Sequence, residues 1–286
     1  MLSSPSMTLP NPQHVILFHH FRRLLERAAE ERIDVAPLKG AHLVTSVYPP
    51  EEDRGPMADV DFLVREEDWT RALEICRELG FRPRFGTLDE GQIHEVGFKV
   101  ELSGGKEVLI EAHRWLVDPR RFSLDHEALW ARSRSSTFDG APCRRLANED
   151  QLCFVAFHEL LHRLGNPSRA LRDVELLLKD EKTDPELVVA RAGEWRVRRA
   201  VWLMLDLLAK KKRDEQSAAT AERLAPPLPI RAAIEALLRD GTVSRWRRLS
   251  YRAQAALLWP LLFDAPHLTA RFVAFHPKAL GRMWRL

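Results

Sequence analysis

The chain has 286 residues, of which 45% are hydrophobic and 30% are charged, and these values exclude a largely disordered protein. The length suits one large domain or two small ones. Lys and Arg total 44 and Asp and Glu total 41, so the net charge of +3 excludes a surface that attracts polyanions over its whole extent. The longest apolar run, residues 255–263, contains Pro260 and is too short to span a bilayer.

The three cysteines, Cys76, Cys143 and Cys153, are odd in number, widely spaced and without a CxxC pair, which argues against a disulfide framework or a zinc ribbon. We expect Cys76 and Cys153 to be core residues, because both lie in apolar helical sequence. The first thirteen residues lack the basic and apolar segments of a secretory signal peptide. The sequence therefore predicts a protein of the reducing cytoplasm.

Residues 1–146 are predicted to form a first domain of mixed strands and helices. Apolar periodicity, β-branched content and turn residues predict a helix at 11–32, a strand at 35–38, a short helix at 41–48, a strand at 59–64, a helix at 66–79, strands at 81–85, 95–102 and 107–116, a helix at 125–133 and an extended segment at 135–146. Gly80 with apolar Phe81 after it predicts a Schellman stop for the preceding helix. Ser103–Lys106 predicts a hairpin turn between two of the strands.

Residues 147–286 are predicted to form a second, all-helical domain. Its helices are expected at 148–164, 168–180, 184–192, 194–211, 214–223 and 228–239. The last part, 245–286, carries eight basic residues against the single acid Asp264, together with seven aromatic residues. Such a segment suits a nucleic-acid backbone, a membrane surface or a last helical layer with buried aromatics, and the sequence leaves these alternatives open.

The sharpest local pattern is the pair Asp59 and Asp61 on the predicted strand 59–64. Side chains two residues apart on a strand leave the same face, so both carboxylates point one way. Mg²⁺ relieves the repulsion of such a pair, and the alternative is a solvated strand edge. Glu111 lies in the middle of another apolar strand, where an acid is costly unless it is paired or bound to a metal, and His113 shares its face.

A second pattern lies upstream, where Lys39 and Gly40 come between a predicted strand and a possible short helix. Glycine allows close approach of the backbone, and a helix start offers N–H groups to a phosphate. Lys39 adds a point charge, and Arg54, five residues before Asp59, has a guanidinium that suits phosphate oxygens. The order of these features along the chain favours a phosphate site beside a metal site.

These residues resemble a known family. The stretch Leu38-Lys39-Gly40, then Arg54-Gly55-Pro56-Met57-Ala58, then Asp59-Val60-Asp61-Phe62-Leu63-Val64 is similar to the signature of uncharacterised bacterial nucleotidyltransferases of the DNA polymerase beta-type superfamily. The likeness covers about residues 15–210 and continues through Ala72, Leu79-Gly80-Phe81, Ile110–Trp115, the histidines His158 and His162, and Leu171-Arg172-Asp173. Residues 211–286 lie outside it.

The resemblance implies an α+β fold, in which a nucleotidyltransferase-type mixed sheet with flanking helices is followed by an all-helical C-terminal domain. Asp59 and Asp61 fall on the family's metal-binding pair and Glu111 on its third carboxylate, with Mg²⁺ or Mn²⁺ as the cofactor. These three residues would be catalytic.

The resemblance assigns nucleotide binding to Lys39, Gly40 and Arg54. The residue after the glycine is Ala41, whereas the superfamily's motif has serine there. Four further residues are candidates for the cleft that closes on the nucleotide, namely His113, His158, Arg172 and Asp173. The alternative for His158 is a structural role, and the simplest interpretation of Arg172 and Asp173 is a polar contact within or between helices.

The implied reaction moves a nucleoside monophosphate from an NTP such as ATP to a hydroxyl acceptor. Cations on the carboxylates would clamp the phosphates and lower the pKa of the acceptor hydroxyl, and Glu111 could act as a base. The acceptor is left open between a small molecule, a protein and an RNA, and the sequence predicts no oligomeric state.

Two other functions compete with this interpretation. One is a catalytically silent protein of the same fold that binds a nucleotide or a partner. The other is a zinc peptidase, because His158-Glu159-Leu160-Leu161-His162 has the HExxH spacing, in which two histidines on one helix face can bind zinc. The longer form of that signature needs a histidine where this chain has Ser168.

Overall fold

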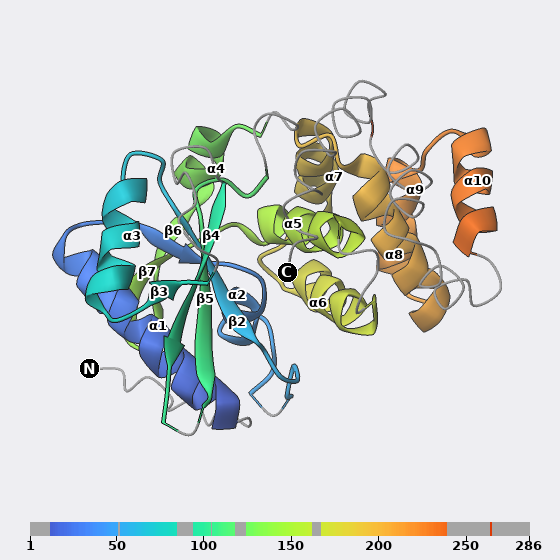
Figure 1. Cartoon of the computed structure of the whole chain (residues 1–286). Helices are drawn as coiled ribbons and strands as arrows, with labels where there is room; N and C mark the ends of the chain where they lie inside the picture. Colours follow the sequence, from blue (N-terminus) through green and yellow to red (C-terminus); the bar gives the residue numbers. More distant parts are fainter. Residues whose placement is uncertain are drawn as a thin grey trace, which may run out of the picture. The chain divides into compact units, whose positions relative to one another are not determined.

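The computed structural model describes residues 12–50, 52–84, 94–103, 105–117, 124–161, 167–238 and 264. Contacts between residues divide the chain into two compact units, and the boundary of the second falls at Asn148 (Figure 1). The first unit contains the described residues up to Val117 together with 125–147. The division into domains 1–146 and 147–286 as separate folding bodies stays a prediction.

The first unit is built on a five-stranded sheet of order β1-β2-β5-β4-β3. The strands, in that order, are Val35–Pro37, Asp59–Val64, Glu107–His113, Glu95–Glu101 and Arg82–Pro83. Only β2 and β5 run parallel, and the other neighbours pair antiparallel. The predicted hairpin between β4 and β5 is confirmed by their antiparallel register.

Helices flank this sheet, and a second, two-stranded sheet pairs β6 (Arg134–Phe138) with β7 (Ala141–Arg145). The helices of this unit are α1 (Pro12–Glu30), α2 (Lys39–Val44), α3 (Trp69–Glu78) and α4 (His126–Arg132). Figure 1 shows α1 and α3 along the same side of the sheet. Their apolar residues meet those of the strands, for example where the ring of Phe21 lies 5.8 Å from the ring of Phe62.

Alternation along the strands decides which face each side chain takes. Val60, Phe62 and Val64 of β2 join the hydrophobic core, and so do Val108, Ile110 and Ala112 of β5 and Val96 and Phe98 of β4. The odd-numbered residues of these strands therefore point to the opposite face. The acidic residues that the sequence singles out are all odd-numbered, and the sheet collects them on that face.

Four local predictions need correction. The helix expected at 66–79 begins at Trp69, because the preceding residues form a tighter turn in which the N–H of Asp68 bonds to the Arg65 carbonyl and that of Trp69 to the Glu66 carbonyl. The short helix expected at 41–48 begins at Lys39 and ends at Val44, so Gly40 lies within its first turn rather than before it.

The extended segment expected at 135–146 is a hairpin. Asp139 and Gly140 form its turn, with φ values of 48° and 82°, and two positive φ values are what a tight hairpin turn of this kind requires. The predicted strand 81–85 is short, with only Arg82–Pro83 paired. The Schellman stop is confirmed, because the N–H of Gly80 bonds to Arg77 and that of Phe81 bonds to Cys76.

The second unit is helical throughout its described elements. These are α5 (Asn148–Leu161), α6 (Pro167–Lys179), α7 (Pro185–Glu194), α8 (Arg198–Lys212), α9 (Glu215–Leu224) and α10 (Leu228–Leu238). Asp184 caps α7, since its side chain accepts a hydrogen bond from the N–H of Glu186. With the mixed sheet of the first unit, this confirms the α+β class and the helical C-terminal part.

One acid from the C-terminal segment takes part in this helical unit. Asp264 accepts hydrogen bonds from the N–H groups of Arg198 and Arg199, at 2.7 and 3.1 Å, at the start of α8. Val197, the N-cap residue there, has no capping side chain of its own. The rest of 245–286, with its basic and aromatic residues, lies outside the described residues.

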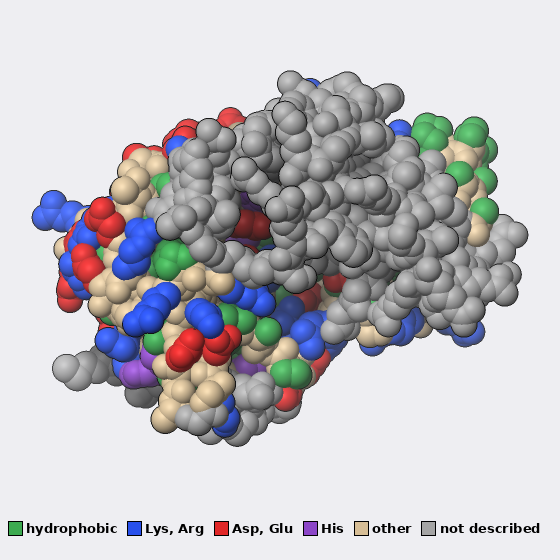
Figure 2. Space-filling model, viewed as in Figure 1, with side chains coloured by type: hydrophobic (Ala, Val, Ile, Leu, Met, Phe, Trp, Pro, Cys, Tyr) green, Lys and Arg blue, Asp and Glu red, His purple; other side chains and the backbone are tan. Residues whose placement is uncertain are grey.

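The described surface carries charges of both signs. Figure 2 shows Lys and Arg side chains intermingled with Asp and Glu side chains over the face of the first unit that it presents. Ion pairs such as those of Arg71 with Glu31 and Glu78 account for part of this pattern. Among the described helices, none has both the length and the hydropathy needed to cross a membrane.

Candidate functional site

The candidate site lies where the two parallel strands of the main sheet run side by side. Asp61 of β2 is the register partner of Glu111 of β5, and Glu111 is in turn the partner of Gly97 on β4. His113 follows two residues after Glu111 and therefore leaves the same face. Neighbouring strands thus bring side chains from distant parts of the sequence to one place.

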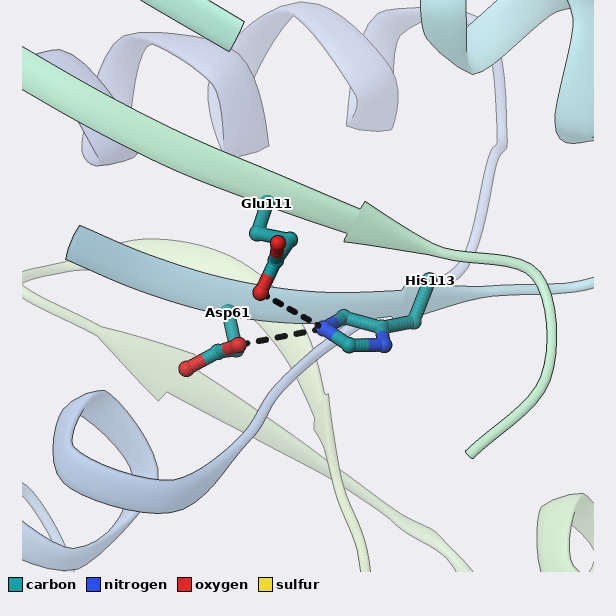
Figure 3. Close-up of side chains that lie close together, drawn as sticks. All are labelled: Asp61, Glu111 and His113. Carbon is teal, nitrogen blue, oxygen red and sulfur yellow. Dashed lines mark hydrogen bonds and ion pairs between the residues drawn. The ribbon is translucent and has the colours of Figure 1, made fainter. Parts of the chain in front are cut away.

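Figure 3 shows Asp61, Glu111 and His113 converging on this face. His113 Nε2 lies 3.1 Å from Asp61 Oδ1 and 3.6 Å from Glu111 Oε2. Asp61 and His113 are buried and Glu111 is half-buried. One ligand atom from each residue lies within 4.8 Å of the other two, so the group has the residue types and the spacing to hold a metal ion.

Lys39 supplies the positive charge closest to this group. Its Nζ lies 2.7 Å from Asp61 Oδ1, and the Lys39 side chain is 15% exposed. Burial opposes the charged ammonium, but the attraction of Asp61, Glu111 and Asp59 outweighs it, and the pKa of Lys39 is raised. Lys39 has a φ of 45°, which is uncommon for a residue with a side chain.

Asp59 lies on the same strand face as Asp61, but it is not part of the close group of ligand atoms. Burial, together with the negative charges of Asp61 and Glu111, raises the pKa of Asp59 to about 6. The carboxylates therefore interact strongly even without a close contact. A bound cation would relieve this repulsion, as expected for a pair of metal-binding acids.

The surrounding acids favour the protonated form of His113 in the metal-free protein. Burial acts against the charge, but the hydrogen bonds with Asp61 and Glu111 outweigh burial and raise the pKa of His113 to about 9. On the other side of the ring, His113 Nδ1 lies 3.7 Å from Glu95 Oε2. Burial of Glu95 is outweighed by its hydrogen bond with His94 and by the charges of His94 and His113, which lower its pKa to about 2.

Gly40 and Arg54 come together beside Lys39. A Cβ atom on Gly40 would lie 2.7 Å from Arg54 Nη1 and 2.5 Å from Met57 Sδ, so any larger residue would require the ends of these two flexible side chains to shift. The hydrogen bond between His14 Nε2 and the Gly55 carbonyl, at 3.2 Å, holds the loop that carries Arg54. The three residues expected to bind phosphate therefore belong to one neighbourhood, and their role in nucleotide binding stays a prediction.

Two residues near the group were missed by reasoning from the sequence. Glu95 meets His113 because the two are register partners of β4 and β5. Arg84, whose N–H donates to the Gly97 carbonyl, lies close enough to lower the pKa of Asp59 in part. Neither residue belongs to a motif, and only the pairing of β4 with β3 and β5 could have found them.

The other residues proposed for a cleft lie in the second unit. His158 is on α5, where its ring lies 5.8 Å from that of Phe154. Arg172 forms an ion pair of 3.0 Å with Glu175 along α6, and Asp173 is buried in the same helix. His162 lies outside the described residues. The cleft role of His158, Arg172 and Asp173, and the HExxH zinc site, stay predictions.

Comparisons with known proteins agree with the resemblance found in the sequence. A family model described as "Uncharacterised nucleotidyltransferase" matches residues 12–211. No curated protein matches the chain.

Two solved structures share similarity with the chain at low identity. The crystal structure of an antigenic nucleotidyltransferase-like protein from Paracoccidioides brasiliensis is 15% identical, with a TM-score of 0.44 over 78% of this chain and 97% of that one. The solution structure of the antibiotic-resistance factor ANT(2″)-Ia is 14% identical, with a TM-score of 0.39 over 72% of this chain and 95% of that one.

Proposed function

The chain belongs to the family of uncharacterised nucleotidyltransferases, and from this premise we propose that it transfers a nucleoside monophosphate from an NTP to a hydroxyl acceptor with the help of a divalent cation. The observation that carries the proposal is the register of β2 and β5, which sets Asp61 beside Glu111 on one face with Asp59 two residues before. We propose a cytoplasmic location as well, because the odd number and wide spacing of the cysteines argue against a disulfide framework.

In this proposal Asp59, Asp61 and Glu111 hold the cation, which is Mg²⁺ or Mn²⁺. Their fit is supported by their chemistry and placement, since three carboxylates from two neighbouring strands share one sheet face and supply the oxygen ligands that Mg²⁺ prefers. When bound, the cation neutralises phosphate charge and lowers the pKa of the acceptor hydroxyl.

The chain's own residues position the reactants. Lys39 and Arg54 neutralise the phosphates of the NTP, such as ATP, and Gly40 lets the backbone approach them. The acceptor oxygen forms a bond to the α-phosphorus, the bond from that phosphorus to the β-phosphate oxygen breaks, and pyrophosphate leaves. Glu111 accepts the proton of the acceptor hydroxyl. Positioning and neutralisation of charge supply most of the acceleration in such displacements.

A transfer assay tests this proposal. The protein is incubated with each α-³²P-labelled NTP, Mg²⁺ or Mn²⁺ and a size-fractionated lysate, and it is compared with Asp61→Asn and the matched control Glu101→Gln. Glu101 is an exposed acid on β4 with a side chain that is 73% exposed. We expect label with the native protein and the control, and none with Asp61→Asn.

The size of the labelled product identifies the acceptor as a small molecule, a protein or an RNA. Absence of both label and metal-dependent NTP binding would contradict the proposal and favour a catalytically silent protein of this fold. Equal labelling by the native protein and Asp61→Asn would contradict the assignment of Asp61 to the catalytic site.

A further inference from the structure

His113 lies beside the proposed metal site, but the proposed reaction gives it no role. It is buried, with a side chain that is 3% exposed, and it leaves the same strand face as Glu111. Its Nε2 is directed at two carboxylates, at 3.1 Å from Asp61 Oδ1 and 3.6 Å from Glu111 Oε2 (Figure 3). A nitrogen so placed faces the same space as the two oxygens that would bind the cation.

The distances suit a shared cation. Metal–ligand bonds of about 2.1 Å allow one ion to contact donor atoms that lie up to about 4.2 Å apart. Both separations that involve His113 Nε2 are within this limit. The oxygens of Asp61 and Glu111 lie within 4.8 Å of each other, so a shared ion needs at most a small rotation of one carboxylate.

The far side of the imidazole ring provides a second, independent observation. Among the described residues His113 Nδ1 has no hydrogen-bond partner, although it is buried. The nearest acid, Glu95, places Oε2 3.7 Å from it, as the register partner of His113 on the neighbouring strand. Histidines that bind metals usually direct their second nitrogen at a carboxylate, which fixes the ring and its tautomer. Glu95, His113 and the carboxylates of Asp61 and Glu111 are arranged in this order, with Glu95 on the Nδ1 side of the ring and the other two acids on the Nε2 side.

We propose that the cation displaces the Nε2 proton of His113 to solvent and is then held by this nitrogen together with Asp61 and Glu111, that Glu95 orients the ring, and that this nitrogen makes the site select Mn²⁺ over Mg²⁺. The inference rests on the proposed function and names its cofactor. Mg²⁺ demands near-ideal octahedral oxygen ligands and gives up its waters reluctantly, so an imidazole in the ligand set disfavours it. Mn²⁺ binds nitrogen and oxygen sites most weakly among the first-row transition ions, but it is the ion of the two proposed here that accepts a mixed set of carboxylates and imidazole.

Electron paramagnetic resonance of the full chain tests the inference without an activity measurement. EDTA-treated protein is titrated with Mn²⁺ alone, and electron spin-echo modulation is recorded for samples with natural histidine and with ¹⁵N-labelled histidine. We expect nitrogen modulation from the bound Mn²⁺ that changes with the isotope. This measurement uses the native chain, so it does not depend on the folding of a variant.

Variants then show which residue supplies the nitrogen that is coupled to the bound Mn²⁺. His113→Gln keeps a polar atom near the position of Nε2, and we expect it to lose the modulation and to weaken Mn²⁺ binding at least tenfold more than Mg²⁺ binding. Glu95→Gln should weaken Mn²⁺ binding by about 10-fold or more, as is usual for carboxylates that orient a ligand histidine. Glu101→Gln, at the other end of β4, should change neither.

Mn²⁺ that binds without nitrogen modulation would overturn the inference, because all its protein ligands would then be oxygens. Modulation that persists in His113→Gln, or the absence of any bound Mn²⁺ at millimolar concentration, would overturn it as well. A protein that transfers labelled nucleotide but shows no nitrogen coupling would refute this inference and leave the proposed function standing.

Discussion

Neutralising Asp59 should stabilise the metal-free protein, whereas neutralising Asp61 should destabilise it. The two residues lie two positions apart on one strand and face the same way, but their surroundings differ. Asp59 carries a raised pKa because burial and the neighbouring acids oppose its charge. Asp61 is contacted by two cations, Lys39 at 2.7 Å and His113 at 3.1 Å. Asp59→Asn therefore relieves repulsion, and Asp61→Asn removes two attractive contacts.

The structure sets the size of both effects. A rise in the pKa of Asp59 from 3.8 to about 6 corresponds to at most about 3 kcal/mol of destabilisation at neutral pH. Because the neighbouring acids Asp61 and Glu111 remain in place, we expect Asp59→Asn to raise the free energy of unfolding by about 1–3 kcal/mol. Removing one partner from a buried ion pair costs about 3–5 kcal/mol. Since Glu111 and Asp59 still face the two cations in Asp61→Asn, we expect a loss of about 2–3 kcal/mol.

Urea unfolding in EDTA measures both variants, with Glu101→Gln as a control that should stay within about 0.5 kcal/mol of the native protein. The raised pKa of Asp59 gives the effect a definite pH dependence. The unfolded chain loses this proton near pH 3.8 and the folded chain near pH 6, so the penalty is complete above pH 6 and absent below 3.8. The gain from Asp59→Asn should thus be present at pH 7.5 and nearly gone at pH 4. A loss of stability in Asp59→Asn, or an equal gain at both pH values, would refute the reasoning.

Two further predictions concern other parts of the fold. Gly40→Ala places a Cβ atom 2.5 Å from Met57 Sδ and 2.7 Å from Arg54 Nη1, so the ends of both flexible side chains must shift, which should cost about 1 kcal/mol in urea unfolding, and an unchanged midpoint would contradict the close packing. His42 is buried, and its pKa is lowered to about 3 by burial and then by the charge of Arg145, so folding disfavours its protonation and stability should fall as the pH drops from 6.5 toward 3. Unfolding at pH 7 and pH 4.5 should show a smaller acid loss in His42→Gln, by about 2 kcal/mol, and parallel losses would refute this.

Much of the site's geometry could be predicted from the sequence because it depends on alternation within single strands. Asp59 and Asp61 share a face on any strand, and so do Glu111 and His113. The strands themselves are marked by apolar and β-branched residues. The prediction that two separate strands bring Asp61 next to Glu111 came from the family resemblance, and the register of β2 and β5 confirms this proximity.

Contacts that depend on strand register or on competition between side chains could not be predicted from the sequence. Glu95 lies opposite His113 because of how β4 and β5 align, and a shift of one residue would have sent it to the core face. Glu66 suits the first turn of a helix, but it lies in the turn before α3 and its carboxylate accepts hydrogen bonds from Arg114 and Trp115, a contact that no sequence pattern marks. The Asp139-Gly140 pair was a readable hairpin signal, and the prediction of one continuous extended segment overlooked it.

The most direct test of the account is the position of the bound metal and nucleotide. Crystals grown with Mn²⁺ and an NTP analogue whose α,β bridge cannot be cleaved would locate the metal by anomalous diffraction. We expect an anomalous peak for Mn²⁺ within ligand distance of Asp61 and Glu111, with the triphosphate directed at Lys39 and Arg54. A metal bound instead at His158, or a nucleotide ordered elsewhere on the chain, would contradict it.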